Sequence, residues 1–306
     1  MGSVNRFNLL TILGPTASGK TRLAVALAGE LAGEIISADS RQVFRGMDIG
    51  SGKDMHEYGD VPYHLIDIME PGEEFSVFAF QRLFIQAFEE ITGRGNLPVV
   101  CGGSGLYLDA ALRGYRLVEV PENAGLREEL AKMGDAELAI MLRELRPGQH
   151  NSTDLIDRSR TIRAIEIARH EARHRADIEP FPAIRPLVLG IRWDRAELRR
   201  RITERLRQRL DSGMIEEVQR LHTMGVAWER LDYYGLEYRF VGAFLRGELT
   251  RNDMFQKLNS AIHAFAKRQE TWFRRMEKHG VAINWVDGAG DTLAEARAVI
   301  NGLHLP

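Results

Sequence analysis

The residues with the clearest chemistry form one glycine-rich string near the start of the chain: Gly14, Pro15, Thr16, Ala17, Ser18, Gly19, Lys20 and Thr21. The string matches G-x-x-x-x-G-K-[ST], whose glycines let several backbone N–H groups point at one anion. A helix that begins at the lysine adds its positive end to the same site. Lys20 supplies a full charge, and the Thr21 hydroxyl can bind Mg²⁺. The string therefore predicts a polyphosphate site with Mg²⁺, but it does not specify a reaction.

Two aspartates follow apolar runs and are candidates for the same site. Asp39 comes directly after Glu34–Ala38. An aspartate at this place can cap a turn, bind Mg²⁺ or act as a general base. Asp67 follows Tyr63–Ile66 and is a second, weaker candidate for binding the metal.

Two further glycine-rich turns carry polar side chains. Ser104 lies in the turn Gly-Gly-Ser-Gly, which follows the apolar run Leu97–Cys101. Gly50-Ser51-Gly52-Lys53 resembles half of a phosphate loop. For this second stretch we expect a flexible turn whose lysine points at an anion.

These residues alternate with segments whose patterns predict strands and helices. Parallel sheets with crossover helices show this alternation, and the carboxyl ends of their strands face the ligand crevice. The glycine-rich string, Asp39 and Ser104 each follow a predicted strand, so each is expected to face that crevice. Strands are predicted at 7–13, 34–38, 97–103, 185–193 and 282–286, and helices at 20–32, 76–94, 195–222, 250–278 and 291–302.

The pattern changes in the middle of the chain. Between residues 115 and 180 strand-like runs disappear, helical periodicity dominates and arginine accumulates. The expected fold class is therefore α/β, a P-loop-containing core with a parallel sheet and crossover helices, interrupted by a helical insertion domain. We predict a first core part at 1–114, the insertion at 115–180, and a second core part with C-terminal helices at 181–306.

Charge is distributed unevenly along the 306 residues. The net charge of −2 by itself argues against a polyanion partner. Residues 158–209, however, hold 15 arginines, no lysine and seven acids, a net +8 that leaves −10 for the remainder. Arginine in excess of lysine suggests forked recognition of phosphates. The alternative is a solvated helix face with local acid partners such as Glu166 and Glu204.

Smaller features restrict the class of protein. Cys101 is the single cysteine, which excludes an intramolecular disulfide and a cysteine zinc cluster. The N-terminus lacks a signal-peptide pattern and no apolar run approaches 18 residues, so we expect a cytoplasmic protein that is not inserted in a membrane. In the stretch 267–275 cations alternate with Trp272 and Phe273, which could stack on bases or anchor a core helix.

Several strings together resemble one family, the tRNA dimethylallyltransferases, also called tRNA isopentenyltransferases. They occur in the family's order between residues 9 and 275. The family's fold, a P-loop core with a helical insertion, agrees with the division predicted above. The strings are GPTASGKT (14–21), ISADSRQVFRGMDIG (36–50), VPYHLIDI (61–68) with Pro71, GGSGLY (102–107), Arg160-x-x-Arg163-Ala-x-Glu166 and KRQETWFR (267–274).

The resemblance implies a reaction. A dimethylallyl group would pass from dimethylallyl diphosphate to the N6 amine of an adenine next to the anticodon (position 37) in tRNA. The phosphate loop and Mg²⁺ would hold the departing diphosphate. Asp39 matches the family's general base, and Ser104 stands where the family commonly has threonine. Arg205 matches the arginine that assists the diphosphate.

The resemblance also implies where tRNA is bound. Two stretches match those that touch tRNA in the family. The insertion would bind the phosphates of the tRNA anticodon stem-loop. The adenine would have to leave its stack to enter a pocket. The chain is expected to act as a monomer. The matching residues are Asp39, Ser40, Arg41 and Gln42 in one stretch, and Ser159, Arg160 and Arg163 in the other.

The chain departs from the family's pattern at two places. The family usually reads Gly-Thr-Ala-Lys where this chain has Gly50-Ser51-Gly52-Lys53. It usually reads Gly-Tyr-Arg or Gly-Tyr-Lys where this chain has Glu237-Tyr238-Arg239. The second change places an acid in a stretch that faces nucleic acid in the family, so it affects the expected RNA specificity more than the diphosphate chemistry.

Three other functions compete with tRNA prenylation. An adenylate isopentenyltransferase would use free AMP, ADP or ATP, and the arginine-rich insertion argues against it. A P-loop small-molecule kinase would use the arginines as a lid over its substrate. A divergent paralogue would bind tRNA without modifying it.

Overall fold

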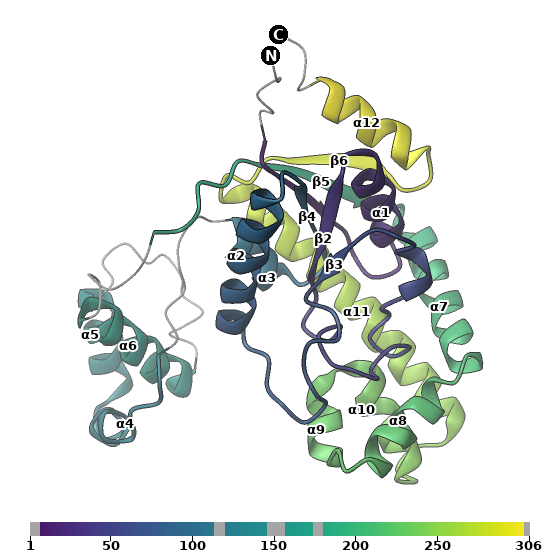
Figure 1. Cartoon of the computed structure of the whole chain (residues 1–306). Helices are drawn as coiled ribbons and strands as arrows, with labels where there is room; N and C mark the ends of the chain where they lie inside the picture. The colour runs from purple at the N-terminus through teal and green to yellow at the C-terminus, as the bar shows by residue number, and fades with distance from the viewer. Residues whose placement is uncertain (1–6, 113–119, 146–156, 174–179, 303–306) are drawn as a thin grey trace. The chain divides into compact units, whose positions relative to one another are not determined.

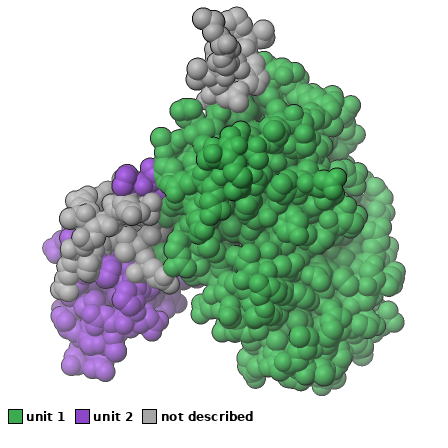
Figure 2. Space-filling model, in the orientation of Figure 1, with its two compact units in different colours: residues 1–114, 182–306 green, residues 115–181 purple. Residues whose placement is uncertain are grey.

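The computed structural model describes residues 7–112, 120–145, 157–173 and 180–302. The chain divides into two compact units, which Figure 2 colours separately. Unit 1 comprises residues 1–114 and 182–306, and unit 2 comprises residues 115–181. Among the described residues no helix is both long and apolar enough to cross a membrane.

Unit 1 is built on a parallel sheet whose described strands follow the order β3-β2-β4-β1-β5-β6 (Figure 1). Every residue of β1 and β2 is buried, as expected for strands covered by helices on both faces. The strands are β1 (Leu9–Leu13), β2 (Gly33–Ala38), β3 (Tyr63–His64), β4 (Leu97–Gly102), β5 (Pro186–Arg192) and β6 (Ile283–Asp287). The predicted strands are therefore present, and the two-residue β3 is an addition whose sequence gave no strand signal.

Helices connect the strands and pack on one another. α1 contacts α12, α2 contacts α3, and the 28-residue α11 contacts α3, α7 and α10. The helices of unit 1 are α1 (Lys20–Glu30), α2 (Val77–Gly93), α3 (Gly105–Leu112), α7 (Arg195–Asp211), α8 (Met214–Thr223), α9 (Trp228–Tyr234), α10 (Leu236–Leu245), α11 (Arg251–Lys278) and α12 (Thr292–Gly302), with the 3₁₀ turn η1 at Met55–Glu57.

One predicted helix is two helices in the structure. The helix expected at 195–222 ends at Asp211, and α8 begins at Met214. Gly213 lies between them with φ +100°, a left-handed conformation that a residue with a Cβ rarely adopts. The break redirects the chain and brings the buried Glu217 of α8 under a loop of the site described below.

Unit 2 is a small helical unit of α4 (Ala124–Ala131), α5 (Asp135–Leu145) and α6 (Arg158–Arg173). Leu130, Leu138 and Ile165 form its apolar core. In the sequence this helical unit interrupts the chain of a parallel-sheet core, and the predicted fold class is confirmed.

Candidate active site

A pocket of about 1560 Å³ lies in unit 1 at the carboxyl ends of three neighbouring strands. Leu13 of β1, Gly102 of β4 and Ala38 of β2 pair in one row of the sheet. The phosphate loop, the Gly-Gly-Ser-Gly turn and Asp39 follow directly after this row. Parallel pairing thus brings together three segments that are far apart in sequence, and all three line the pocket.

The phosphate loop has the curled backbone that its sequence predicts. Ala17 and Gly19 both have positive φ, +62° and +88°, and α1 begins at Lys20. Two side chains hold the loop from outside, because Trp193 Nε1 donates to Ser18 O at 3.0 Å and Arg201 Nε donates to Ala17 O at 3.0 Å. Burial lowers the pKa of the Lys20 ammonium, which lines the pocket together with Thr21.

Gln269 joins the phosphate loop to the Gly-Gly-Ser-Gly turn. Its Oε1 accepts from Thr16 N at 2.9 Å, and its Nε2 donates to Gly103 O at 2.9 Å. This residue lies on the buried side of α11, between the buried Ala266 and Phe273. The sequence analysis did not assign this role to Gln269, because it considered only the cations and aromatic residues of this stretch. The signal that could have found it is a polar residue on an otherwise apolar face of the helix.

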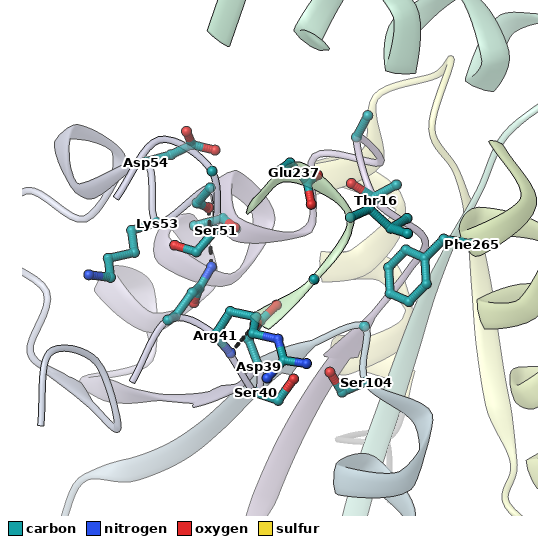
Figure 3. Close-up of a pocket in the computed structure, with 18 of the residues that line it drawn as sticks. Thr16, Asp39, Ser40, Arg41, Ser51, Lys53, Asp54, Ser104, Glu237 and Phe265 are labelled. Carbon is teal, nitrogen blue, oxygen red and sulfur yellow. Dashed lines mark hydrogen bonds between the residues drawn. The ribbon is translucent and has the colours of Figure 1, made fainter. Parts of the chain in front are cut away.

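Asp39 and its neighbours form the wall after β2. Asp39 Oδ1 accepts from Arg41 N at 2.8 Å, so the carboxylate also caps its own turn. Arg41 donates to Tyr233 O at 3.1 Å, and Gln42 donates to Gly52 O at 3.1 Å. In Figure 3, Asp39, Ser40 and Ser104 lie in the same lower part of the pocket.

Arginines of α7 line the pocket from one helix face. Arg201, Arg205 and Arg209 follow one another on α7 at a spacing of four residues, and all three line the pocket. Arg201 lies 4.1 Å from the ring centroid of Trp193, and Arg205 Nη2 forms an ion pair with Asp54. Lys20, Arg205 and Arg209 are three of the cationic residues that line the pocket, and together they are suited to bind an anion.

The loop after Met47 is fixed by buried charges. Glu217, which is 1% exposed, accepts from Asp48 N, Ile49 N and Gly50 N at 2.7–3.0 Å, and from Tyr238 Oη at 3.0 Å. A buried carboxylate that accepts four hydrogen bonds is well satisfied. The sequence offered no signal for this role of Glu217, since its partners are more than 160 residues away for three of the four bonds.

Lys53 and Asp67 differ from their expected roles. Lys53 is fully buried, and its Nζ donates to Phe44 O at 2.7 Å, to Asp48 Oδ1 at 2.7 Å and to Asp67. The lysine does point at anions, but they are carboxylates of its own loop region. Asp67 lies outside the residues that line the pocket, so the structure does not support it as a metal ligand there.

The predicted tRNA residues on α6 lie in unit 2. Arg163 donates to Val120 O at 2.7 Å and pairs with Glu166, which is 2% exposed. Burial works against ionisation of Glu166, but hydrogen bonds from Arg127, Asn123 N and Arg163 together lower its pKa to about 2. Arg163 thus ties unit 2 together, whereas Ser159 and Arg160 are exposed.

The aromatic cluster of α11 divides between core and pocket. Phe273 is fully buried, as expected for a core anchor, while Trp272 lines the pocket beside Gly105. Phe265 and Leu106 are exposed and line the same pocket. Cys101 is buried, and its burial raises the pKa of the thiol to about 11, as expected for an unreactive thiol.

Comparison with known proteins gives a consistent result. The family model described as IPP transferase matches residues 42–276, and the isopentenyl transferase model matches residues 7–58. The tRNA dimethylallyltransferase 2 of Trichlorobacter lovleyi is 75% identical over 295 residues, 96% of this chain and 97% of that protein. The protein of the same name from Pelobacter propionicus is 75% identical over 302 residues, 98% of this chain and 96% of that protein. A crystal structure of the full-length tRNA isopentenylpyrophosphate transferase of Bacillus halodurans matches with a TM-score of 0.71 at 33% identity, covering 97% of this chain and 96% of that one.

Proposed function

The chain belongs to the IPP transferase family, and from this premise we propose that it transfers a dimethylallyl group from dimethylallyl diphosphate to the N6 amine of an adenine next to the anticodon (position 37) in tRNA, releasing diphosphate. One observation supports this reaction most strongly. Three neighbouring parallel strands end at the same level of the sheet. They are followed by the phosphate loop, Asp39 and Ser104, all of which line one pocket. An anion site and a proton acceptor are therefore available to one reacting centre.

The cationic side of the pocket would hold the leaving group. As the bond between the dimethylallyl carbon and the diphosphate oxygen breaks, negative charge develops on the diphosphate. Preorganised N–H groups of the loop, Lys20 and Arg205 stabilise that charge without reorganising during the reaction. The pocket is thus suited to hold a diphosphate that departs, which is a different task from transferring a phosphoryl group.

The donor set also fits Mg²⁺. Among the described residues no group of three or more His, Cys, Asp or Glu side chains could enclose a metal. Mg²⁺ commonly uses one or two protein oxygens plus substrate phosphates, and the Thr21 hydroxyl in the pocket is such an oxygen. When bound, the ion would neutralise charge on the diphosphate.

The acceptor side would be the wall of Asp39 and Ser104. The N6 amine is a poor nucleophile because its lone pair is delocalised into the adenine ring. Asp39 would accept the proton that this nitrogen loses as the new carbon–nitrogen bond forms, and the Ser104 hydroxyl would hydrogen-bond near it. The five-carbon group would pack on the apolar side chains of Phe265, Leu106 and Trp272, which line the pocket.

The same proposal covers the macromolecular partner. The adenine must leave its stack to reach the pocket. Arg41 and Gln42 at the pocket wall would contact the anticodon loop, together with Ser40, and Ser159, Arg160 and Arg163 would contact it from unit 2. We propose that the chain does this as a monomer in the cytoplasm.

Competition between acceptors tests the proposal against its alternatives. Unmodified tRNA is incubated with the chain and labelled dimethylallyl diphosphate, with and without millimolar AMP or ATP. Label is expected in tRNA at position 37, and free nucleotide should not reduce it. Label in the nucleotide would support the adenylate transferase, while ATP-dependent phosphate release would support the kinase. Affinity for tRNA without turnover would support the non-modifying paralogue.

A further inference from the structure

Arg209 is placed by a glycine. Gly52 has φ +69°, and a Cβ added to it would lie 1.7 Å from Arg209 Nη2 and 3.0 Å from Arg205 Nη2. The guanidinium of Arg209 therefore occupies the space that any larger residue at position 52 would need. The Arg209 guanidinium can lie at this place in the pocket wall because residue 52 is a glycine and has no side chain.

An acid approaches the same guanidinium from another element. Glu237, in the first turn of α10, has its Oε1 3.9 Å from Arg209 Nη1. Burial raises the pKa of Glu237, and Arg209 opposes that rise. Gly52 and Glu237 are two of the positions at which the chain departs from the family's usual residues, Ala and Gly respectively, and both lie against the Arg209 guanidinium.

Arg205 and Arg209 each have an acidic neighbour. They lie one turn apart on α7, and each faces an acid at the pocket wall, Asp54 for the first and Glu237 for the second. In Figure 3, Asp54 and Glu237 both lie in the upper part of the view, whereas Asp39 and Ser104 lie in the lower part. Burial lowers the pKa of Arg209 to about 10, which keeps it charged at neutral pH.

We propose that Arg209 is a further anion-binding residue whose guanidinium exchanges Glu237 for a phosphoryl oxygen of the diphosphate. Glu237 is a positioning residue that holds the guanidinium in the pocket until the anion arrives. At 3.9 Å the pair is longer than a hydrogen-bonded ion pair, and the Glu237 side chain is 20% exposed, so water can solvate it after the exchange. This inference rests on the proposed function, since it assigns the anion to the same site.

Calorimetric titration of the full chain with magnesium pyrophosphate tests the exchange. Arg209→Gln removes a charge-assisted contact and is expected to weaken binding roughly 10- to 100-fold. Glu237→Gln removes the competing acid and is expected to tighten binding a few-fold. Arg207→Gln is the matched control on α7, because Arg207 is exposed, lies outside the pocket and faces Phe255. It should change binding less than twofold.

Two results would overturn the proposal. Arg209→Gln could bind pyrophosphate as tightly as the Arg207→Gln control does. Glu237→Gln could instead weaken binding as much as Arg209→Gln, which would mean that the pair is a fixed structural contact. Thermal unfolding of each variant separates loss of binding from loss of the fold.

A double-mutant cycle tests the role of Gly52. Gly52→Ala should weaken pyrophosphate binding in the wild-type background by displacing the guanidinium, and much less in the Arg209→Gln background. Equal losses in both backgrounds would contradict the assigned role. Transfer of label to tRNA is measured separately. If the wild type labels tRNA but Arg209→Gln binds pyrophosphate as tightly as the wild type does, only this inference fails. If the wild type binds pyrophosphate and Arg209→Gln binds it weakly, but the wild type does not label tRNA, only the proposed function fails.

Discussion

Ser104 lies at the acceptor side of the pocket and differs from the family's threonine by one methyl group. Ser104→Ala removes the hydroxyl near the reacting amine and is expected to lower kcat roughly 10-fold. Ser104→Thr keeps the hydroxyl and should stay within a few-fold of the wild type. Steady-state prenylation of tRNA measures both. Equal losses in the two variants would show that space at this position matters more than the hydroxyl.

Single residues at strand ends could be predicted, but residues brought in from distant segments could not. Asp39 and Ser104 follow apolar runs, so parallel topology alone predicted that they face the crevice. Both hydrogen bonds of Gln269, and three of the four that Glu217 accepts, join residues more than 160 positions apart, and the local pattern carries no trace of these contacts. Lys53 looked like an anion ligand because its neighbours are glycines, yet its burial against Asp48 and Asp67 makes it structural.

Elements are held to one another by a few buried charges, and Glu34 of β2 is one of them. Its carboxylate accepts from Arg94, just after α2, from Asn96, and from His64 of β3 at 2.7–3.0 Å. The hydrogen bond from Arg94 is the largest influence that lowers the Glu34 pKa, to about 2, while burial opposes it. Because Arg94 is half exposed and screened by solvent, the lowered pKa corresponds to at most about 3 kcal/mol of stability at neutral pH.

Glu34→Gln should therefore destabilise the protein at pH 7 by about 3 kcal/mol or less. A lowered pKa stabilises the fold above the unfolded pKa of 4.5 and loses that effect as pH falls toward 2. Urea unfolding from pH 7 to pH 3 should show the difference from wild type shrinking below about pH 4.5. Glu30→Gln, in the exposed pair with Arg297, is the matched control with little effect. A pH-independent difference for Glu34→Gln would argue against an ionic role.

Most strands could be predicted from the sequence, because buried strands of a parallel sheet are continuous apolar runs. Helical periodicity could not show the break at Gly213, since the apolar spacing continues across it and only the backbone conformation changes. β3 has two residues and too little pattern for a sequence-based prediction.

At the scale of the whole molecule, the net charge of −2 conceals an uneven distribution of charge, because a positive segment at 158–209 extends over both units. Of the 15 arginines at 158–209, six fall in unit 2 and nine in unit 1, so the positive segment is not confined to the insertion. Part of it is used internally. Arg158 pairs with Asp135 and donates to the carbonyls of Ala131 and Met133, and Arg200 pairs with Glu197 and Glu204.

Salt dependence of tRNA binding separates the internal arginines from those free to meet phosphate. Arg160 is exposed on α6, so Arg160→Gln should weaken tRNA binding and reduce the slope of log K against log salt by about one. Arg158→Gln should leave that slope unchanged and instead destabilise unit 2. Binding measured between about 50 and 200 mM salt gives both slopes. An unchanged slope for Arg160→Gln would remove this residue from the tRNA surface.

The central claim is that one pocket holds both the departing diphosphate and the amine that replaces it, with Asp39 as the proton acceptor. Single-turnover transfer of labelled dimethylallyl to unmodified tRNA by wild type and Asp39→Asn tests this most directly, because asparagine can keep the Arg41 N hydrogen bond but cannot take the proton. We predict a rate lowered roughly 10²- to 10⁴-fold, with tRNA and pyrophosphate affinities within a few-fold of wild type. An Asp39→Asn enzyme that transfers the label at the wild-type rate would contradict the claim.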